Sequence, residues 1–114
     1  MGPTDYIKIP NLIHRRLYRL QDCHQFDIGV FDATRNHFVG LKVEWGYSDL
    51  ITAGHWDLPH LPGLHIYAKP VKDLGVDVPE GVSLWDANEV EQSNPNLLAW
   101  LDEQQKIFTR GVSK

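Results

Sequence analysis

Cysteine is almost missing from this chain, because Cys23 is the one cysteine among 114 residues. A single thiol cannot form an intramolecular disulfide, and a zinc site built from four cysteines is excluded as well. Long apolar runs are also missing, since no stretch approaches the ~18 residues that a membrane-spanning helix needs. Residues 1–11 lack the basic and apolar segments of a secretory signal. These absences predict a cytoplasmic protein that does not enter a membrane.

The chain also lacks the sequence motifs that are typical of several common enzyme classes. It contains no glycine-rich phosphate loop of either standard spacing, and no serine stands in a Gly-x-Ser-x-Gly elbow. No two carboxylates can be paired as an acid and a base from their positions in the sequence. We therefore assign no catalytic residue, and a binding function is favoured over an enzymatic one.

Lysine and arginine are missing from residues 73–103, although this segment is rich in Asp and Glu and the whole chain has a net charge of −4. Such a segment argues against direct nucleic-acid binding, which needs a contiguous basic surface. The simplest interpretation is a solvated acidic face. The alternatives are a patch that binds a basic partner and an inhibitor that mimics a nucleic-acid backbone. In both alternatives the candidate contact residues are Asp86, Glu89 and Glu91.

What the chain does contain is enough apolar material for one domain over residues 1–114. Hydrophobic residues make up 42% of the chain and include four Trp, four Tyr and four Phe. A chain of this length buries roughly two-thirds of its unfolded surface, so it needs no disulfide to hold a core. Residues 1–11, which include Pro3 and Pro10, are predicted to form a loosely ordered arm.

Alternating apolar residues predict a sheet. The second half of residues 12–20 is assigned to a strand, and residues 25–32 and 37–45 are predicted to form an antiparallel hairpin. In the second of these strands Val39, Leu41, Val43 and Trp45 are expected to share the core-facing side. A turn at residues 46–49, a third short strand at 50–53 and a further strand at 64–69 complete the predicted meander. Glycines 29, 40, 46 and 54 are interpreted as bulges or tight turns.

Residues 70–85 contain too many Pro and Gly residues for regular structure beyond one helical turn. Beyond them, Pro95 is a good first helical residue, an apolar stripe follows, and Gly111 is a natural stop. We expect a helix over residues 95–109, lying on the open face of the sheet. The predicted fold class is α+β: a small antiparallel meander of about four or five strands covered by a C-terminal helix.

Residues 54–67 read GHWDLPHLPGLHIY and bring three histidines close together in the sequence. Pro59 and Pro62 exclude a helix, so only a loop can converge these side chains. A metal site is one hypothesis, with zinc or iron as the ion and with an open position for water. It would make the chain a metal-dependent enzyme, such as a hydrolase. The candidate ligands are His55, Asp57, His60 and His65.

The same stretch also suits a recognition loop without any cofactor. Large aromatic residues are enriched in protein interfaces because they bury much area at little conformational cost. Trp56, His60 and Tyr67 are the candidate partner-binding residues of this loop. Elsewhere in the chain, the adjacent residues Cys23 and His24 are a poor thiolate–imidazole couple, because adjacent strand residues point to opposite faces.

The segments LYRL, IGVFD, FVGLKVEWG and GHWD together form a recognisable pattern. A Tyr-Arg pair precedes a Gly-Val-aromatic strand, a Phe-x-Gly strand and a His-aromatic-Asp element. Over residues 17–82 this pattern resembles small, uncharacterised accessory proteins encoded by bacteria and their phages. The resemblance implies an accessory protein that acts by contact with a partner, and it carries no activity to transfer.

The favoured function is thus a non-enzymatic binding module that contacts a macromolecular partner, which we expect to be a protein. The metal-dependent enzyme and the nucleic-acid mimic stay open as alternatives. The sequence leaves a homo-oligomer open as well.

Overall fold

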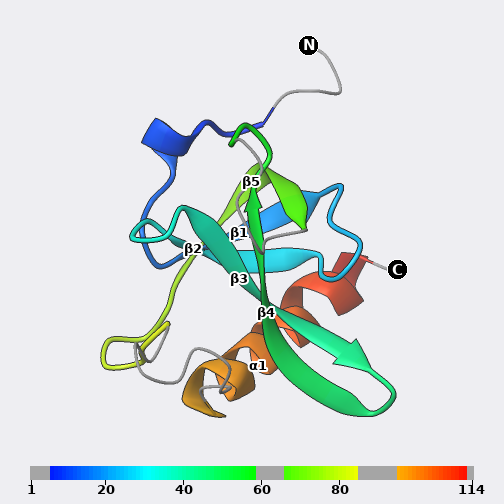
Figure 1. Cartoon of the computed structure of the whole chain (residues 1–114). Coiled ribbons are helices and arrows are strands. Elements are labelled where there is room, and N and C mark those ends of the chain that lie inside the picture. Colours follow the sequence, from blue (N-terminus) through cyan, green and yellow to red (C-terminus); the bar gives the residue numbers. More distant parts are fainter. Residues whose placement is uncertain (1–5, 59–65, 85–94, 113–114) are drawn as a thin grey trace.

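The fold of the chain is seen in a computed structural model, which describes residues 6–58, 66–84 and 95–112 (Figure 1). Five strands and one α-helix make up this part of the chain, so the predicted α+β class is confirmed. A short 3₁₀ turn, η1, precedes the strands. The elements are η1 (Ile9–Asn11), β1 (Arg16–Gln21), β2 (Ile28–Asp32), β3 (His37–Glu44), β4 (Tyr47–His55), β5 (Tyr67–Asp77) and α1 (Pro95–Val112).

The five strands close into a barrel in the order β1-β2-β3-β4-β5. Neighbours from β1 to β4 are antiparallel, as the meander predicts. The prediction of a purely antiparallel sheet is wrong, however, because β4 and β5 pair in parallel at Gly54↔Tyr67 and His55↔Ala68. β5 then pairs with β1 in the antiparallel sense and closes the ring. The sheet is therefore mixed.

The prediction that residues 70–85 lack regular structure is also wrong for the part that is described. β5 continues through Pro70 and Gly75 to Asp77. The β1–β5 register shifts between Arg16 and Tyr18 and again between Arg19 and Leu20, and Gly75 has a φ of 75°. Such irregular pairing accepts a proline and a left-handed glycine that a regular central strand would exclude.

The turn between β3 and β4 lies earlier in the chain than expected. Glu44 pairs directly with Tyr47, so Trp45 and Gly46 form a two-residue loop, with φ values of 56° and 84°. Positive φ at both central residues is the pattern of a type I′ turn, whose twist suits a hairpin. β4 consequently begins at Tyr47 rather than at residue 50. Trp45 leaves the core-facing side to which the alternation assigned it.

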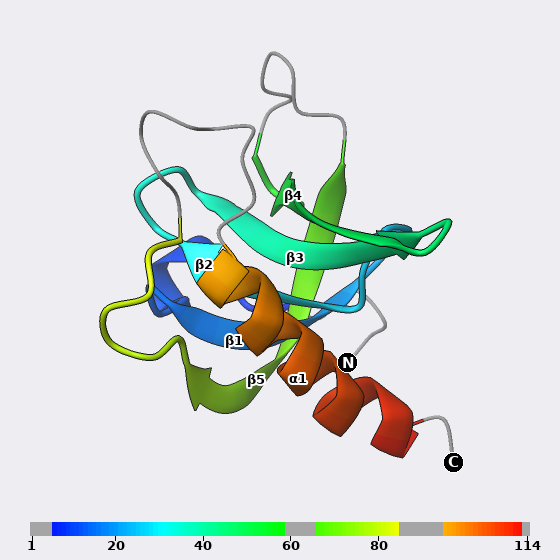
Figure 2. The same cartoon turned by 90° about the horizontal axis from the view of Figure 1, so that it is seen from below.

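Buried side chains gather in two layers. The inner cluster fills the barrel and contains Tyr18, Leu20, Phe26, Phe31, Phe38, Ala53 and Ala68. The outer cluster lies between the barrel wall and α1, which crosses the outside of the barrel in Figure 2. It contains Leu17, Ile28, Val30, Val39, Leu41, Val78, Leu84, Leu97 and Leu101. The helix covers the sheet as the sequence predicts.

Gly29 and Gly40 pair across β2 and β3, and both lie under the ring of Phe26. A Cβ at Gly40 would come within 2.3 Å of that ring. The two glycines therefore make room for an aromatic side chain inside the barrel, and no register shift marks a bulge at this pair. The bulge or tight-turn interpretation is wrong at both positions.

α1 begins at Pro95 as expected and continues through Gly111 to Val112, so Gly111 does not end it. The guanidinium of Arg19 on β1 donates to the carbonyl oxygen of Phe108 at 3.1 Å and ties the last turns of the helix to the barrel. Within the three described ranges, no helix is long and apolar enough to cross a membrane.

β3 and β4 form a ribbon with two distinct ends. At the arm end, where β3 begins and β4 stops, residues 6–8 of the N-terminal arm lie against the barrel, with the Ile7 N–H donating to the Pro70 carbonyl oxygen at 2.7 Å. At the hairpin end, the Trp45–Gly46 turn extends away from the rest of the barrel (Figure 1). The two ends surround their side chains in different ways.

Candidate functional site

Several of the predicted contact residues lie outside the described part of the chain. They are His60 and His65 of the histidine stretch and Asp86, Glu89 and Glu91 of the acidic segment. His55, Trp56, Asp57 and Tyr67 are described, and all four lie at or next to the arm end.

His55 is fully buried, and main-chain groups hold both of its ring nitrogens. The N–H of Asp57 donates to Nδ1 at 3.0 Å, so Nδ1 is an acceptor and the proton of the neutral ring is on Nε2. Nε2 in turn donates to the carbonyl oxygen of Ile7 at 2.9 Å. The ring also stacks on Phe38. In this arrangement His55 has no lone pair left for a metal ion, and it fastens the arm to the end of β4.

Asp57 is part of a small exposed cluster with the arm. The Tyr6 hydroxyl donates to Oδ1, and Lys8 forms an ion pair with Oδ2 at 3.2 Å. The hydrogen bond from Tyr6, helped by Lys8, lowers the pKa of Asp57 below its usual range. Among the residues with described positions, no three His, Cys, Asp or Glu side chains gather closely enough to hold a metal ion.

The two described aromatic candidates of the recognition loop are only partly available. Trp56 is 46% exposed, and Lys69 lies over its ring, 4.4 Å from the centroid. Lys69 is itself held by Asp22 at 3.2 Å. Tyr67 is half-buried and also has a partner. The protein's own residues therefore already engage the ring of Trp56 and interact with Tyr67.

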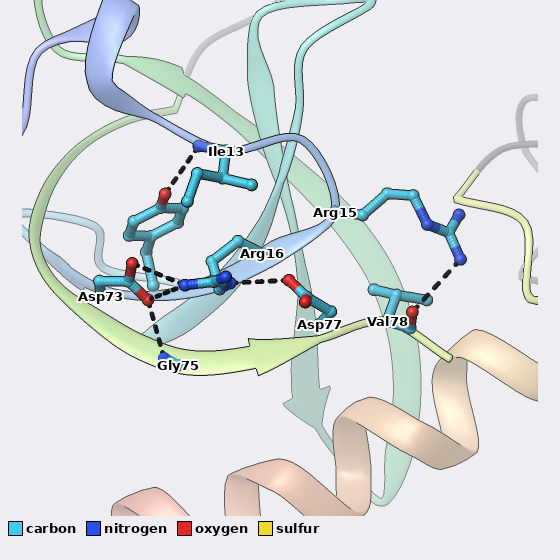
Figure 3. A network of polar contacts seen from close by, with 8 residues as sticks. Ile13, Arg15, Arg16, Asp73, Gly75, Asp77 and Val78 are labelled. Carbon is cyan, nitrogen blue, oxygen red and sulfur yellow. Dashed lines mark hydrogen bonds and ion pairs between the residues drawn. The ribbon is translucent and has the colours of Figure 1, made fainter. Parts of the chain in front are cut away.

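Arg15 and Arg16, at the start of β1, also have partners within the protein, as Figure 3 shows. Arg16 donates to Asp77 at 2.7 Å and to both oxygens of Asp73, at 2.8 and 3.0 Å, across the β1–β5 seam that closes the barrel. These two carboxylates raise the pKa of Arg16 above its usual range. Arg15 donates to the carbonyl oxygen of Pro79 at 2.8 Å. Asp73 and Asp77, the first acids of the acidic segment, thus pair with the half-buried Arg16 while both carboxylates stay exposed.

The hairpin end differs, because its large side chains are uncovered. Trp45 is 87% exposed, Tyr47 74% and Val43 54%. The indole N–H of Trp45 donates to Glu44 at 2.9 Å, which fixes the ring beside the turn. Apart from this bond, no hydrogen bond or ring contact of the indole with another described residue is seen. Sequence reasoning did not select Val43, Trp45 or Tyr47 as site residues. The signal it missed is the Trp-Gly pair flanked by alternating strands, which is a two-residue turn pattern with an aromatic residue in the first position.

A pocket of about 260 Å³ opens at the base of the same hairpin. Its apolar wall is formed by Phe26, Leu41 and Val43, and Val43 is itself 54% exposed. The polar wall combines the β1–β2 connection with one residue of α1. These polar residues are His24, Gln25, Asp27 and Gln105. Cys23, next to His24, is half-buried and packs against the inner cluster.

Comparison with protein families, with curated proteins and with solved structures found no match to the chain. The chemistry of the two ribbon ends is therefore the basis for assigning a function.

Proposed function

We propose that this chain is a binding module that engages a partner protein through its hairpin end. Trp45 and Tyr47 form the contact surface at the turn, and the pocket at the base of the hairpin receives a side chain of the partner. The module acts by contact and not by catalysis. An uncovered group of large apolar side chains is typical of a protein interaction site, and Trp and Tyr are the residues most enriched in interface hot spots.

Trp45 is the observation that carries this proposal. Its φ of 56° lies in the left-handed region, where an L-residue other than glycine is disfavoured by about 1–2 kcal/mol. The first position of a two-residue turn favours Asn, Asp or Gly. At 87% exposure the indole gains little from burial either. Since folding does not account for a tryptophan here, the residue points to a function in recognition.

The pocket offers a second point of contact at the same hairpin. Val43 lines it and pairs with Ser48, so it lies on the face of the ribbon opposite to Tyr47. A partner that wraps around the hairpin can place one side chain between the apolar wall and Asp27. Asp27 is exposed, and no ion pair of its carboxylate with a described residue is seen. A side chain with an apolar stem and a polar or charged end fits this combination of walls.

Affinity capture from a lysate of the source organism tests the proposal. The bait is the full chain, compared with the Trp45→Ala/Tyr47→Ala double variant. We expect a protein that is retained by the wild type to fall at least tenfold in yield on the variant, which corresponds to about 1.4 kcal/mol of binding free energy.

Trp56→Ala is the matched control, because it removes an exposed tryptophan from the other end of the ribbon. Retention on this control is expected to equal that of the wild type. Equal retention on all three baits, or a loss confined to Trp56→Ala, would contradict the assignment of the surface to the hairpin end.

A further inference from the structure

β4 has two edges that are used very differently. Along one edge it pairs with β3 over its whole length, from Glu44↔Tyr47 to His37↔Gly54. Along the other edge it meets β5 only at Gly54 and His55. Within the described ranges, no strand therefore lies against the second edge of residues 47–53. We call this stretch the open edge of β4.

The main-chain groups on the open edge follow from the register. The Gly54 N–H donates to the Ile66 carbonyl oxygen, and the Trp56 N–H donates to the Ala68 carbonyl oxygen. The main-chain N–H and C=O groups of the even-numbered residues of β4 therefore point toward the β5 side. The β3–β4 ladder runs without a register shift. The N–H and C=O groups of Ser48, Leu50 and Thr52 therefore point out of the open edge, in the two-residue spacing that an added strand requires.

Within residues 47–53 themselves, the open edge lacks the lysine, proline and bulges that often protect against strand addition. Natural edge strands are guarded by lysine, proline, bulges or a covering element. Residues 47–53 read YSDLITA, which contains no Lys or Pro, and their pairing with β3 has no bulge. The exposed ring of Tyr47 stands at the start of this edge, next to Trp45. Main-chain pairing and the aromatic patch can therefore serve one ligand together.

Charge decides which kind of strand fits. Lys42 is the basic residue of this part of the ribbon, and it is held by Glu44 at 2.6 Å. Asp49 lies opposite Lys42 in the register, is exposed, and has no ion pair with any residue whose position is described. The ribbon is thus left with an uncompensated carboxylate. A second copy of the chain would add another Asp49 and another net charge of −4, which disfavours self-pairing.

We propose that an extended segment of the partner protein, carrying lysine or arginine, adds to the open edge of β4 as a further strand. This inference rests on the proposed function and specifies how the partner binds. Main-chain hydrogen bonds to Ser48, Leu50 and Thr52 supply affinity, as in other cases of strand addition. The basic side chain pairs with Asp49, and its cationic group can also contact the ring of Tyr47, which lies on the same face of β4 as Asp49.

The probe is a phage-displayed library of random twelve-residue peptides, selected on the full chain. We expect the selected peptides to be enriched in Lys and Arg and in β-branched residues. Affinity is then measured on Ser48→Pro, which removes one outward N–H while leaving the β3 ladder intact, and on Ser48→Ala, which keeps that N–H. A proline is tolerated at an edge position whose N–H faces solvent. The expected result is a loss of at least tenfold for Ser48→Pro and less than threefold for Ser48→Ala.

A scan on the peptide side needs no variant of the protein. Methylating the backbone nitrogens of a selected peptide one at a time should weaken binding at every second position. No selected peptide on the wild type would overturn both this inference and the proposed function. Binding that depends on Trp45 and Tyr47 but shows neither a Ser48→Pro effect nor a two-residue period would overturn strand addition alone. A concentration-dependent dimer that Ser48→Pro abolishes would mean that a second copy of the chain occupies the open edge. That result would contradict the assignment of the edge to a partner protein.

Discussion

At one end of the β3–β4 ribbon, His55 is completely buried and both of its ring nitrogens have main-chain partners. At the other end, Trp45 is 87% exposed in a backbone conformation that suits it poorly. The arm end contains the residue types that usually attract a functional hypothesis, namely His, Asp, Lys and Tyr. In the structure these side chains bind one another and the arm.

The two ends of the ribbon differ in whether the fold accounts for their functional-looking side chains. At the arm end the side chains of Tyr6, Lys8, His55 and Asp57 are each explained by a hydrogen bond or an ion pair of the fold. At the hairpin end, Trp45 and Tyr47 are explained by neither burial nor turn preference. A residue that the fold does not need is a better guide to a binding surface than a reactive residue whose bonding capacity is already used.

The largest effect on stability is expected at the arm end, from His55→Ala. The substitution leaves the Asp57 N–H and the Ile7 carbonyl oxygen without partners and opens a cavity beside Phe38. We expect the free energy of unfolding in urea to fall by about 3 kcal/mol. Trp45→Ala, at the hairpin end, should change it by about 0.5 kcal/mol or less. Equal changes in the free energy of unfolding for the two variants would contradict the difference proposed between the two ends of the ribbon.

A second large effect concerns His37, which pairs with Gly54 next to His55. Burial lowers the pKa of His37 to about 4 in spite of the nearby Asp32, and Arg35 adds to the lowering. The unfolded chain binds this proton near pH 6.5, so between pH 6.5 and 4 the unfolded state holds more protons than the folded state. The stabilisation from the neutral His37 side chain is complete above pH 6.5 and is lost as the pH falls toward 4, by about 3 kcal/mol in all.

Urea unfolding at pH 7, 5.5 and 4.5 measures this dependence. In His37→Gln the slope over this pH window should flatten, whereas the exposed control His24→Gln should keep the wild-type slope. A slope that is unchanged in His37→Gln would mean that another group is responsible.

A smaller effect separates folding from binding at the hairpin end. Gly46 has a φ of 84° and no atom near its missing Cβ, so Gly46→Ala introduces backbone strain without a clash. We expect the free energy of unfolding to drop by about 1 kcal/mol. Affinity for a peptide selected on the wild type should stay within about threefold, because the Trp45 and Tyr47 side chains are untouched. Loss of binding as large as that of the Trp45→Ala/Tyr47→Ala variant would show that the turn conformation is itself the binding determinant.

The smallest effect is expected from Tyr6→Phe. It removes the hydrogen bond that contributes most to the lowered pKa of Asp57, so this pKa should rise toward its ordinary value of 3.8. The lowered pKa gives stability that is present above pH 3.8 and is lost as the pH falls through the folded value, and this loss should shrink in the variant. Side-chain carboxyl NMR titration measures the shift. An unchanged pKa would mean that Lys8 alone controls Asp57.

Much of the fold follows from local patterns in the sequence. Alternation places β2 and β3, and the apolar stripe after Pro95 places α1, because both patterns record which side of an element is buried. Closure of the barrel could not be predicted from local patterns. Pro70 and Gly75 are residue types that usually interrupt a strand, and only the pairing of β5 with an irregular β1 shows why they are accepted. Likewise, Gly29 and Gly40 are explained by Phe26, which is distant from Gly40 in sequence.

The candidate site was harder to predict, and for a physical reason. His55 and Asp57 do lie together, but their partners Tyr6, Ile7 and Lys8 come from the other end of the chain, and no spacing rule links them. Exposure of Trp45 depends on a turn two residues long, and a shift of the turn by one residue reverses the side that each neighbouring side chain faces. His60, His65, Asp86, Glu89 and Glu91 stay predictions.

The most direct test of the hairpin assignment is Trp45→Asn, measured for stability and for binding in the same preparation. Asn suits the first position of this turn, so the free energy of unfolding should rise by about 0.5–1 kcal/mol. Binding of the captured partner, or of a selected peptide, should fall at least tenfold at the same time. A variant that is more stable and binds as well as the wild type would contradict the account, because Trp45 would then serve neither folding nor recognition.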